Sequence, residues 1–360
     1  MRRLLPLLAL AAALLGATLP PPARDAEFRS HPRAKVELGR LLFYDRVLSG
    51  DFRVSCASCH HHRQASSNGV PLADDAGPEP DERAAAEALA AYRRLNPSTD
   101  HAPPLFNLGH RSVTALFHDR RVRREGDRIV SPLGDDLPAG IESVLAVQAL
   151  VPAVTTGEQV GNGHGNALER LASRDRRAVF RELERRLAGL PDYAPLFRAA
   201  YPRVREPADI RIHHVANAIA AFVATEWRAD DSPFDRYLRG KSSLTERQRE
   251  GLDLFYGSAG CATCHAGPFG SDGRVYPAVR ASAKFAAIRT PMLRNVVRTG
   301  PWGHGGRFET LPSFVAAHVP ETSADERAAL LAFLRSLTDE RSLSGRLGPP
   351  TAVPSGLVLD

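Results

Sequence analysis

Cys56-Ala57-Ser58-Cys59-His60 and Cys261-Ala262-Thr263-Cys264-His265 have the same form and contain all four cysteines of the 360-residue chain. In the pattern C-x-x-C-H, two thiols can add to the vinyl groups of one haem, and the adjacent histidine can bind its iron. A zinc ribbon and a thioredoxin-like redox pair are the alternatives. The two pairs of a zinc ribbon usually lie closer together, and they do not require a histidine directly after each pair. The motifs therefore predict two covalently bound haem c groups.

The first residues have the form of an export signal. Met1-Arg2-Arg3 is positively charged, and the apolar stretch 4–19 that follows is shorter than the roughly 20 apolar residues of a bilayer span. We expect a signal peptide within residues 1–23, cleaved after Ala17 or after Ala23, and no stable membrane anchor. Haem attachment to C-x-x-C-H takes place outside the bacterial cytoplasm, which agrees with a location in the periplasm.

The composition is that of a globular protein, with 43% hydrophobic and 24% charged residues. The formal net charge of +6 falls by two when Arg2 and Arg3 leave with the signal, and haem propionates lower it further. No Lys- and Arg-rich run with interleaved aromatic residues supports binding to nucleic acid. A basic face would suit an acidic redox partner.

Helical periodicity dominates the chain, and strand signals are scarce, so the sequence predicts a mainly α fold. Residues 167–187 show one continuous helical pattern. The capping boxes Thr245-x-x-Gln248 and Ser323-x-x-Glu326 predict the starts of two helices in the second half of the chain.

The length allows two domains, and each would contain one of the two motifs. The proline-containing segment 190–207 is the expected boundary. It gives an N-terminal domain over residues 28–205 and a C-terminal domain over residues 206–341. Residues 342–360 are rich in Gly and Pro and are expected to form a loose tail.

Four further stretches occur in a fixed order between about residue 36 and residue 338. They are Leu38-Gly39-Arg40-Leu41-Leu42-Phe43, Leu48-Ser49-Gly50, Cys264-His265-Ala266-Gly267-Pro268-Phe269 and Thr290-Pro291-Met292-Leu293-Arg294-Asn295-Val296. Together with the two motifs they resemble the bacterial di-haem cytochrome c peroxidase family, which also includes MauG. The resemblance implies two cytochrome c-like haem domains that face each other. It also implies that the N-terminal haem reacts with peroxide, and that a six-coordinate C-terminal haem relays electrons.

The resemblance assigns His60 to the iron of the peroxidatic haem and His265 to the iron of the relay haem. The family pattern of Gln followed ten residues later by Glu is matched by Gln148 and Glu158, which the resemblance places in the distal pocket. There a carboxylate could move a proton from the inner to the outer oxygen of peroxide, while the glutamine holds the peroxide. Without the family register, Glu158 would be a surface acid in a glycine-rich loop.

The second axial ligand of the relay haem departs from the family. The only methionine outside the signal, Met292, lies in a motif where the family has no ligand. The family ligand, Met in the peroxidases and Tyr in MauG, comes eight positions after the Thr of a Thr-Leu pair, and Thr310-Leu311 places His318 there. We expect ligation by His265 and His318, which makes this haem harder to reduce than a Met-ligated one. His304 is the rival ligand, and His318 would otherwise be an exposed helix residue.

Two other departures concern the region between the haems. Where the peroxidases have Phe-Trp-Asp-Gly-Arg, this chain has the stretch 117–121, Phe-His-Asp-Arg-Arg. His118 could bridge electron transfer, the local register could be shifted, or the histidine could enter a haem pocket. Thr299 and Pro301 match the two family positions whose carbonyls bind calcium, but the family asparagine is replaced by His101, a poor ligand for a hard cation. Calcium binding stays open.

No histidine occurs between His62 and His101, so the ligand that closes the first haem of resting peroxidases is missing from its usual loop. We expect this haem to be five-coordinate or water-bound. The first hypothesis is a periplasmic enzyme that reduces hydrogen peroxide with electrons from a small donor protein, or that oxidises a partner protein as MauG does. The second is a non-catalytic di-haem electron carrier, because His101, His110 and His118 could close the first haem. Family likeness also suggests a homodimer.

Overall fold

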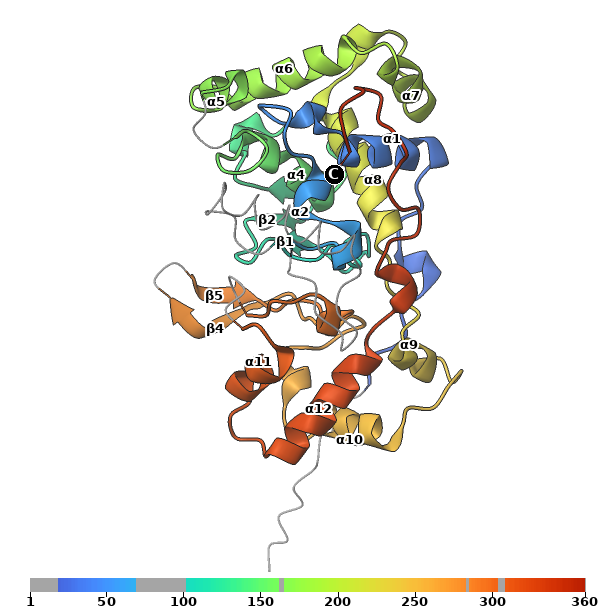
Figure 1. Ribbon diagram of the computed structural model, residues 1–360, viewed down its shortest axis with the longest axis vertical. Helices are drawn as coiled ribbons and strands as arrows, with labels where there is room; N and C mark the ends of the chain where they lie inside the picture. The colour runs from blue at the N-terminus through green and yellow to red at the C-terminus, as the bar shows by residue number, and fades with distance from the viewer. Residues whose placement is uncertain (1–18, 69–101, 162–164, 283–284, 304–307, 360) are drawn as a thin grey trace, which may run out of the picture.

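Helices are the main regular elements of the structure and strands are few and short, as the sequence predicts (Figure 1). The computed structural model describes residues 19–68, 102–161, 165–282, 285–303 and 308–359. The helices are α1 (Arg33–Tyr44), α2 (Cys56–Cys59), α4 (Val144–Leu150), α5 (Ala167–Ala172), α6 (Arg176–Ala188), α7 (Tyr193–Ala200), α8 (Ile212–Glu226), α9 (Pro233–Leu238), α10 (Glu246–Tyr256), α11 (Leu311–His318) and α12 (Ala324–Ser336). The strands are β1 (Ala115–Leu116), β2 (Val122–Glu125), β3 (Arg128–Val130), β4 (Val275–Ser282) and β5 (Phe285–Arg289). None of the helices in these ranges is long and apolar enough to span a bilayer.

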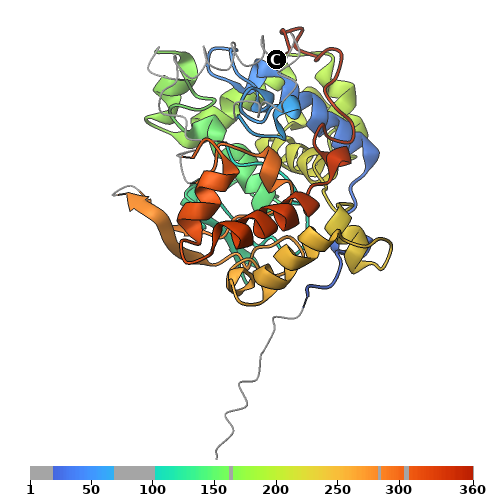
Figure 2. The same cartoon turned by 60° about the horizontal axis from the view of Figure 1, so that its bottom comes forward.

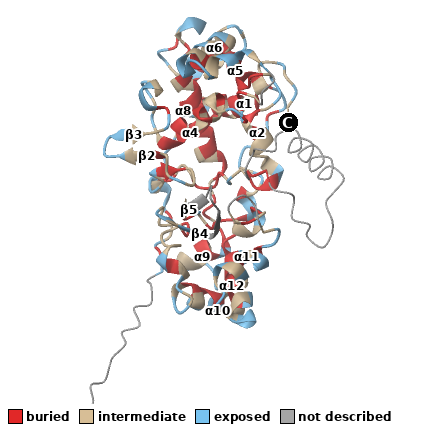
Figure 3. Cartoon of the chain, turned by 90° about the vertical axis from the view of Figure 1, so that its left-hand side faces the viewer, coloured by how far each residue is buried: buried red, intermediate tan, exposed pale blue. Residues whose placement is uncertain are grey.

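The first hydrophobic core is built around α8, which α1 and α4 both contact. Buried residues occupy almost the whole length of α8, as the red ribbon in Figure 3 shows. Gly39 lets α1 approach α8 closely, because a Cβ at this position would lie 1.8 Å from the carbonyl oxygen of Ala218. A helix that is buried on several sides is the centre of its core.

The boundary between the two cores differs from the prediction. The sequence places it at residue 205, before α8, but the first core extends to Ala229 and the second begins at Phe234. The helical pattern of α8 does not reveal which part of the chain it packs against, since periodicity reports a face and not a partner. We call residues 19–229 the first unit and residues 233–341 the second unit.

The second core lies between α10, α11 and α12, in the lower half of Figure 1 and toward the viewer in Figure 2. Phe333 packs edge to face on Phe234 at a centroid distance of 5.2 Å, and it packs at a tilt against Phe255 at 5.1 Å. Both predicted capping boxes are confirmed: Thr245 caps α10 and Ser323 caps α12.

The predicted continuous helix over residues 167–187 is two helices. α5 ends at Ala172, and α6 begins at Arg176. Asp175 forms the break, because its carboxylate accepts a hydrogen bond from the N–H of Arg177 at 2.9 Å and caps α6.

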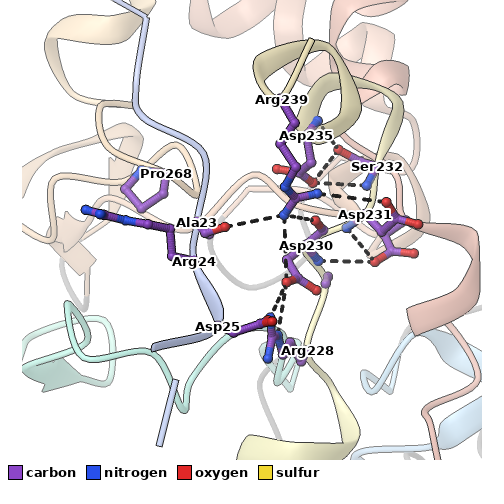
Figure 4. A network of polar contacts seen from close by, with 12 residues as sticks. Ala23, Arg24, Asp25, Arg228, Asp230, Asp231, Ser232, Asp235, Arg239 and Pro268 are labelled. Carbon is purple, nitrogen blue, oxygen red and sulfur yellow. Dashed lines mark hydrogen bonds and ion pairs between the residues drawn. The ribbon is translucent and has the colours of Figure 1, made fainter. Parts of the chain in front are cut away.

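A network of polar contacts fixes the linker between the two units (Figure 4). Arg239 donates hydrogen bonds to the carbonyl of Asp230 at 2.7 Å and to the carbonyl of Ala23 at 3.3 Å. The buried carboxylate of Asp339, just after α12, accepts from the N–H groups of Asp230 and Asp231, each at 3.1 Å. The start of the chain and the end of α12 are therefore bound to the same linker.

Residues 342–359, the described part of the expected loose tail 342–360, are not loose, contrary to the expectation from their composition. This C-terminal segment runs back over the first unit, next to α1 (Figure 1). Glu226, at the end of α8, accepts hydrogen bonds from the backbone N–H groups of residues 346–348 at 2.7 to 3.1 Å. The hydroxyl of Ser355 donates to the buried carboxylate of Asp45 at 2.6 Å. Most of these contacts are hydrogen bonds from backbone N–H groups, so no pattern of apolar residues in the sequence predicts them.

The strands form two small antiparallel sheets, β1-β2-β3 and β4-β5. The β4-β5 hairpin belongs to the second unit and lies against the first (Figures 1 and 3). At its end, the N–H of Arg289 donates to the carbonyl of His118 at 2.6 Å. The hairpin therefore connects the two units near the stretch that distinguishes this chain from the peroxidases.

Candidate haem-binding sites

The first C-x-x-C-H motif forms the single turn α2, and the loop after it is shaped around His60. The Nδ1 atom of His60 lies 3.0 Å from the carbonyl oxygen of Ser66. A carbonyl can only accept, so Nδ1 carries the proton and Nε2 keeps its lone pair for a metal. Ala65 and Ser66 both have positive φ, 50° and 57°, which is uncommon for residues other than glycine and turns this carbonyl toward the imidazole.

The second motif has the same local design. The Nδ1 atom of His265 lies 2.9 Å from the carbonyl oxygen of Gly270, so its Nε2 is also available to a metal. The buried guanidinium of Arg294 donates to the carbonyl of Pro268 and to the carboxylate of Asp235, both at 2.7 Å. These bonds fix the loop that follows His265.

His318 is the last residue of α11 and faces His265. Their ring centroids are 6.2 Å apart, and the ring planes differ by 68°. Two metal–nitrogen bonds of about 2.0 Å, together with the radii of the rings, place two imidazole centroids about 6 Å apart across one metal ion. Within the described part of the chain, the His318 ring has no hydrogen-bond partner, and it stacks on Phe314 at 5.3 Å.

His318 is nevertheless exposed by surface area, as an ordinary surface helix residue would be. Desolvation by the surrounding protein still lowers the pKa of its imidazole. Protein therefore surrounds the ring on several sides. The spacing to His265 is compatible with a metal ion shared by the two imidazoles.

Glu158 lies in a loop that packs against the first motif. The side-chain amide of its neighbour Gln159 donates to the sulfur of Cys56 at 3.4 Å, and the Gln159 carbonyl accepts from the N–H of Gly50 at 2.7 Å. The Glu158 side chain is exposed, yet desolvation raises the pKa of its carboxyl, while the positive charge of Arg121 lowers it. Both observations describe a carboxyl with protein on several sides and one open side.

Gln148 lies in α4, which packs on β1 and β2. Its side-chain oxygen is buried and has no hydrogen-bond partner among the residues that the structure describes. A buried amide atom without a partner costs free energy, so it is expected to meet a ligand. This observation fits a position in a pocket that a bound group completes.

His118 lies where the two units meet, in the turn between β1 and β2. The Arg289 backbone and side chain bind this turn, at the carbonyls of His118 and Phe117 respectively. Arg289 is followed by Thr290, whose carbonyl accepts from the hydroxyl of Ser271 at 2.6 Å. His118 is thus connected through a few residues to the loop that follows His265.

His110, one of the histidines available to close the first haem, has other partners. Its ring packs edge-on against Phe28 and Phe269, each at a centroid distance of 4.9 Å. The Nδ1 atom lies 2.8 Å from the Ser112 hydroxyl, and the Nε2 atom lies 3.6 Å from the Glu27 carboxylate. His101 and the rival ligand His304 lie outside the described residues.

The candidate calcium positions lie near the second core. Thr299 is buried, and Pro301 is partly buried. Across the described ranges, no group of three or more His, Cys, Asp or Glu side chains is placed to hold a metal ion.

The residues present fit two haem groups. Each motif offers two thiols and an imidazole with an available Nε2, and the unpaired amide oxygen of Gln148 awaits a partner. Sequence reasoning missed Gln159, Arg120 and Arg289. The position of Gln159 next to Glu158 in the sequence could have indicated that it belongs to the site. No such signal exists for Arg289, because its contact with the first unit depends on the pairing of β4 with β5.

A family model described as "Di-haem cytochrome c peroxidase" matches residues 33–243. Cytochrome-c peroxidase IdrP2 of Denitromonas iodatirespirans is 26% identical over 378 residues, which cover 88% of this chain and 86% of the relative. Methylamine utilization protein MauG of Methylorubrum extorquens is 28% identical over 355 residues, covering 88% and 83%. Cytochrome c551 peroxidase of Pseudomonas aeruginosa is 27% identical over 352 residues, covering 89% and 84%.

Two solved structures share the fold. A MauG-like protein associated with microbial copper homeostasis superposes with a TM-score of 0.59 at 23% identity, covering 93% of this chain and 97% of that one. The diheme peroxidase BthA from Burkholderia thailandensis gives a TM-score of 0.53 at 21% identity, covering 92% and 91%. At these identities the likeness describes the arrangement of the backbone alone.

Proposed function

The chain belongs to the di-haem cytochrome c peroxidase family, a family of oxidoreductases, and we propose that it reduces hydrogen peroxide to water in the periplasm. The first haem, attached at Cys56 and Cys59 and bound by His60, is the proposed site of reaction. Cys261, Cys264 and His265 would hold the second haem, which would supply electrons to the first. When bound, the haems supply the electrons that break the O–O bond.

Glu158 and Gln148 carry the proton chemistry in this proposal. Before the O–O bond of peroxide breaks, one oxygen must lose a proton and the other must gain one. Glu158 takes the first proton and returns it to the outer oxygen, for which a carboxyl with a raised pKa is suited. Gln148 holds the peroxide with its side-chain amide, whose oxygen has no hydrogen-bond partner among the described residues.

His265 and His318 would together bind the iron of the relay haem. The facing geometry of their rings supports this ligand pair. A haem with two nitrogen ligands favours ferric iron, so it is harder to reduce than one with a methionine ligand. His118, whose carbonyl binds the hairpin of the second unit, is the proposed electron relay between the haems.

The donor of electrons is a small periplasmic protein or a partner protein that is itself oxidised. The absence of a methionine ligand and of the usual closing histidine favours the second, MauG-like activity. One relative carries the name MauG, and one neighbour in structure is described as MauG-like. The proposal includes a homodimer only on the basis of family likeness.

A non-catalytic electron carrier is the competing function. It requires a second ligand on the first haem, and His110 is poorly placed for that role, because its ring is enclosed by Phe28 and Phe269. A carrier also has no use for Glu158. The position of this carboxyl, next to the residue that contacts Cys56, is the observation that carries the peroxidase proposal.

The test is peroxide-dependent oxidation of an artificial electron donor by the haem-loaded protein. In Glu158→Gln we expect the rate to fall by about 10² to 10⁴, the usual contribution of general acid–base catalysis. Glu125→Gln, at an exposed position of β2, is the matched control and should keep the full rate. Equal rates in the two variants would remove Glu158 from the mechanism, and a wild-type protein without any peroxide-dependent oxidation would favour the carrier.

Calcium is a separate part of the proposal. The carbonyls of Thr299 and Pro301 are the candidate ligands, and without an asparagine at position 101 we expect weak binding. Dialysis against a chelator should then leave the absorption spectrum of both haems unchanged. A spectral change that calcium alone reverses would show a tight site.

A further inference from the structure

Arg120 has an unusual backbone conformation at the interface between the two units. Its φ is +60°, in the left-handed region that glycine adopts freely and that costs other residues conformational free energy. It stands where the peroxidase pattern Phe-Trp-Asp-Gly-Arg has its glycine. A strained residue in place of a permissive one points to a use for its side chain.

Among the residues that the structure describes, no carboxylate pairs with the guanidinium of Arg120. Its Nε atom is buried and makes no hydrogen bond within the described ranges. The adjacent carboxylate, Asp119, binds Arg121 instead, at 3.1 Å to both its backbone N–H and its guanidinium. The nearest acid therefore does not neutralise the charge of Arg120.

Arg289 brings a second positive charge to the same place from the other unit. Its Nε donates to the carbonyl of Phe117 at 3.2 Å, and its backbone N–H donates to the carbonyl of His118. No carboxylate among the described residues pairs with it. Burial lowers the pKa of Arg289, and the charge of Arg120 lowers it further, which shows that the two guanidinium groups repel each other.

Two like charges that are partly buried and unpaired are costly unless an anion joins them. The cluster lies between the two candidate haem sites. Arg289 precedes Thr290, whose carbonyl binds the loop after His265, while Arg121 acts on the carboxyl of Glu158 beside the first motif. Each haem carries two propionate carboxylates, which are the anions that a loaded protein would bring to this interface.

We propose that Arg120 and Arg289 together bind haem propionates at the interface between the two units. This inference rests on the proposed binding of two haems. Guanidinium groups suit the role because their planar donors match a carboxylate in pairs. Since the two arginines come from different units, haem loading would also hold the units in their relative position.

Arg120→Gly tests the proposal without harming the fold, because glycine accepts a φ of +60° without strain. We expect normal haem content and an equal or higher Tm. Spectroelectrochemical titration should show the reduction equilibrium of at least one haem shifted tenfold or more toward ferric iron, about 59 mV more negative for one electron. The shift follows because an unpaired propionate charge stabilises the ferric state.

The pH dependence distinguishes loss of charge from a structural effect. In the variant, the propionate loses the cation that kept its pKa low, so it should take up a proton as the pH falls toward its ordinary carboxyl range. Protonation removes negative charge near the iron, and the potential should rise as the pH falls. In the wild-type protein the same propionate stays ionised, and this slope should be absent.

Arg289→Gln and Arg289→Lys test the second arginine. The Gln variant should shift the potential as Arg120→Gly does, and the Lys variant, which keeps the charge, should shift it less. Arg181→Gln on α6, where the arginine is exposed, is the control and should change nothing. The haem whose potential moves identifies the source of the propionate, since a five-coordinate and a bis-histidine haem differ in absorption.

Three outcomes would overturn the proposal. In one, the loaded variants keep the wild-type potentials and pH dependence, which leaves the proposed peroxidase function standing. In another, Arg289→Lys shifts the potential as far as Arg289→Gln does, so that charge is not the cause. In the third, wild-type protein matured in a competent host contains no haem by pyridine haemochrome assay, and the proposed function fails as well.

Discussion

The imidazole rings of His265 and His318 face each other with their centroids 6.2 Å apart and their planes 68° apart. The first value is the spacing of two ligands on one metal ion, and the second describes ligand planes that are far from parallel. Axial ligands with crossed planes leave the iron d orbitals close in energy. A ferric haem bound in this way gives a strongly anisotropic low-spin EPR signal.

We predict that signal in the resting ferric protein, together with a high-spin signal from the first haem. His318→Ala should convert the low-spin haem to high spin. His318→Met should raise its reduction potential by on the order of 0.1 V, a part of the ~0.8 V range over which axial ligands act. His213→Ala, at a half-buried histidine of α8, is the control. A low-spin signal that survives in His318→Ala would rule out this ligand.

The stability of the protein should depend on pH through Glu158. Burial raises the pKa of its carboxyl above the ordinary value of 4.5, against the smaller opposing effect of Arg121. The folded protein therefore holds this proton more tightly than the unfolded chain does, and the stability from the proton is lost as the pH rises through the folded pKa. The Glu158→Gln variant has no ionisable group at this position, so its stability should not fall in this way as the pH rises.

The Tm of Glu158→Gln minus that of the wild-type protein should therefore grow as the pH rises above 4.5. Near neutral pH the variant should therefore be more stable than the wild-type protein, although it should be less active. This is expected where a catalytic group lowers the stability of the folded protein. Thermal unfolding of both haem-loaded proteins over a pH series measures this. A difference that stays constant with pH would contradict the assignment.

The ion pair of Arg294 and Asp235 is almost fully buried, with side-chain exposures of 2% and 1%. Asp235→Ala leaves the arginine charge buried without its partner, so we expect a loss of about 3–5 kcal/mol in the free energy of unfolding. The exposed pair of Arg247 and Asp325 is the control, and Asp325→Ala should change the free energy of unfolding far less, because solvent screens an exposed pair. Urea titrations of the loaded proteins compare the two, and equal losses would contradict the argument.

The carboxylate of Glu226 holds the C-terminal segment through three backbone N–H groups. Glu226→Gln replaces one acceptor oxygen with an NH₂ group that would face a donor, so we expect a loss of about 1–3 kcal/mol. The segment should then become sensitive to proteases, which mass spectrometry of timed digests would detect. Glu340→Gln, at an exposed position, is the control. Equal digestion of both variants would show that other contacts hold the segment.

Local features of the sequence predicted much of the structure. The capping boxes at Thr245 and Ser323 depend on residues three positions apart, and both were confirmed. The orientation of His60 and His265 also depends on nearby carbonyls, those of Ser66 and Gly270. Such short-range geometry is fixed before the rest of the chain is in place.

Features that depend on distant partners were missed. The pattern of α8 is the same whether it packs on α1 or on α10, so the boundary was placed too early. The β4-β5 hairpin has no strong strand signal, and Pro277 within β4 is unfavourable in a strand because proline cannot donate to a ladder. Without the hairpin, the sequence could not predict that Arg289 forms hydrogen bonds with the first unit.

The C-terminal segment also has a consequence for the order of assembly. Val353 belongs to the first hydrophobic core, and Ser355 binds Asp45, more than 300 positions earlier in the chain. A polypeptide is synthesised from its N-terminus, so the first unit cannot reach its final packing before residues 353–355 have been made. The first hydrophobic core is therefore complete only when segments more than 300 positions apart in the sequence are both in place.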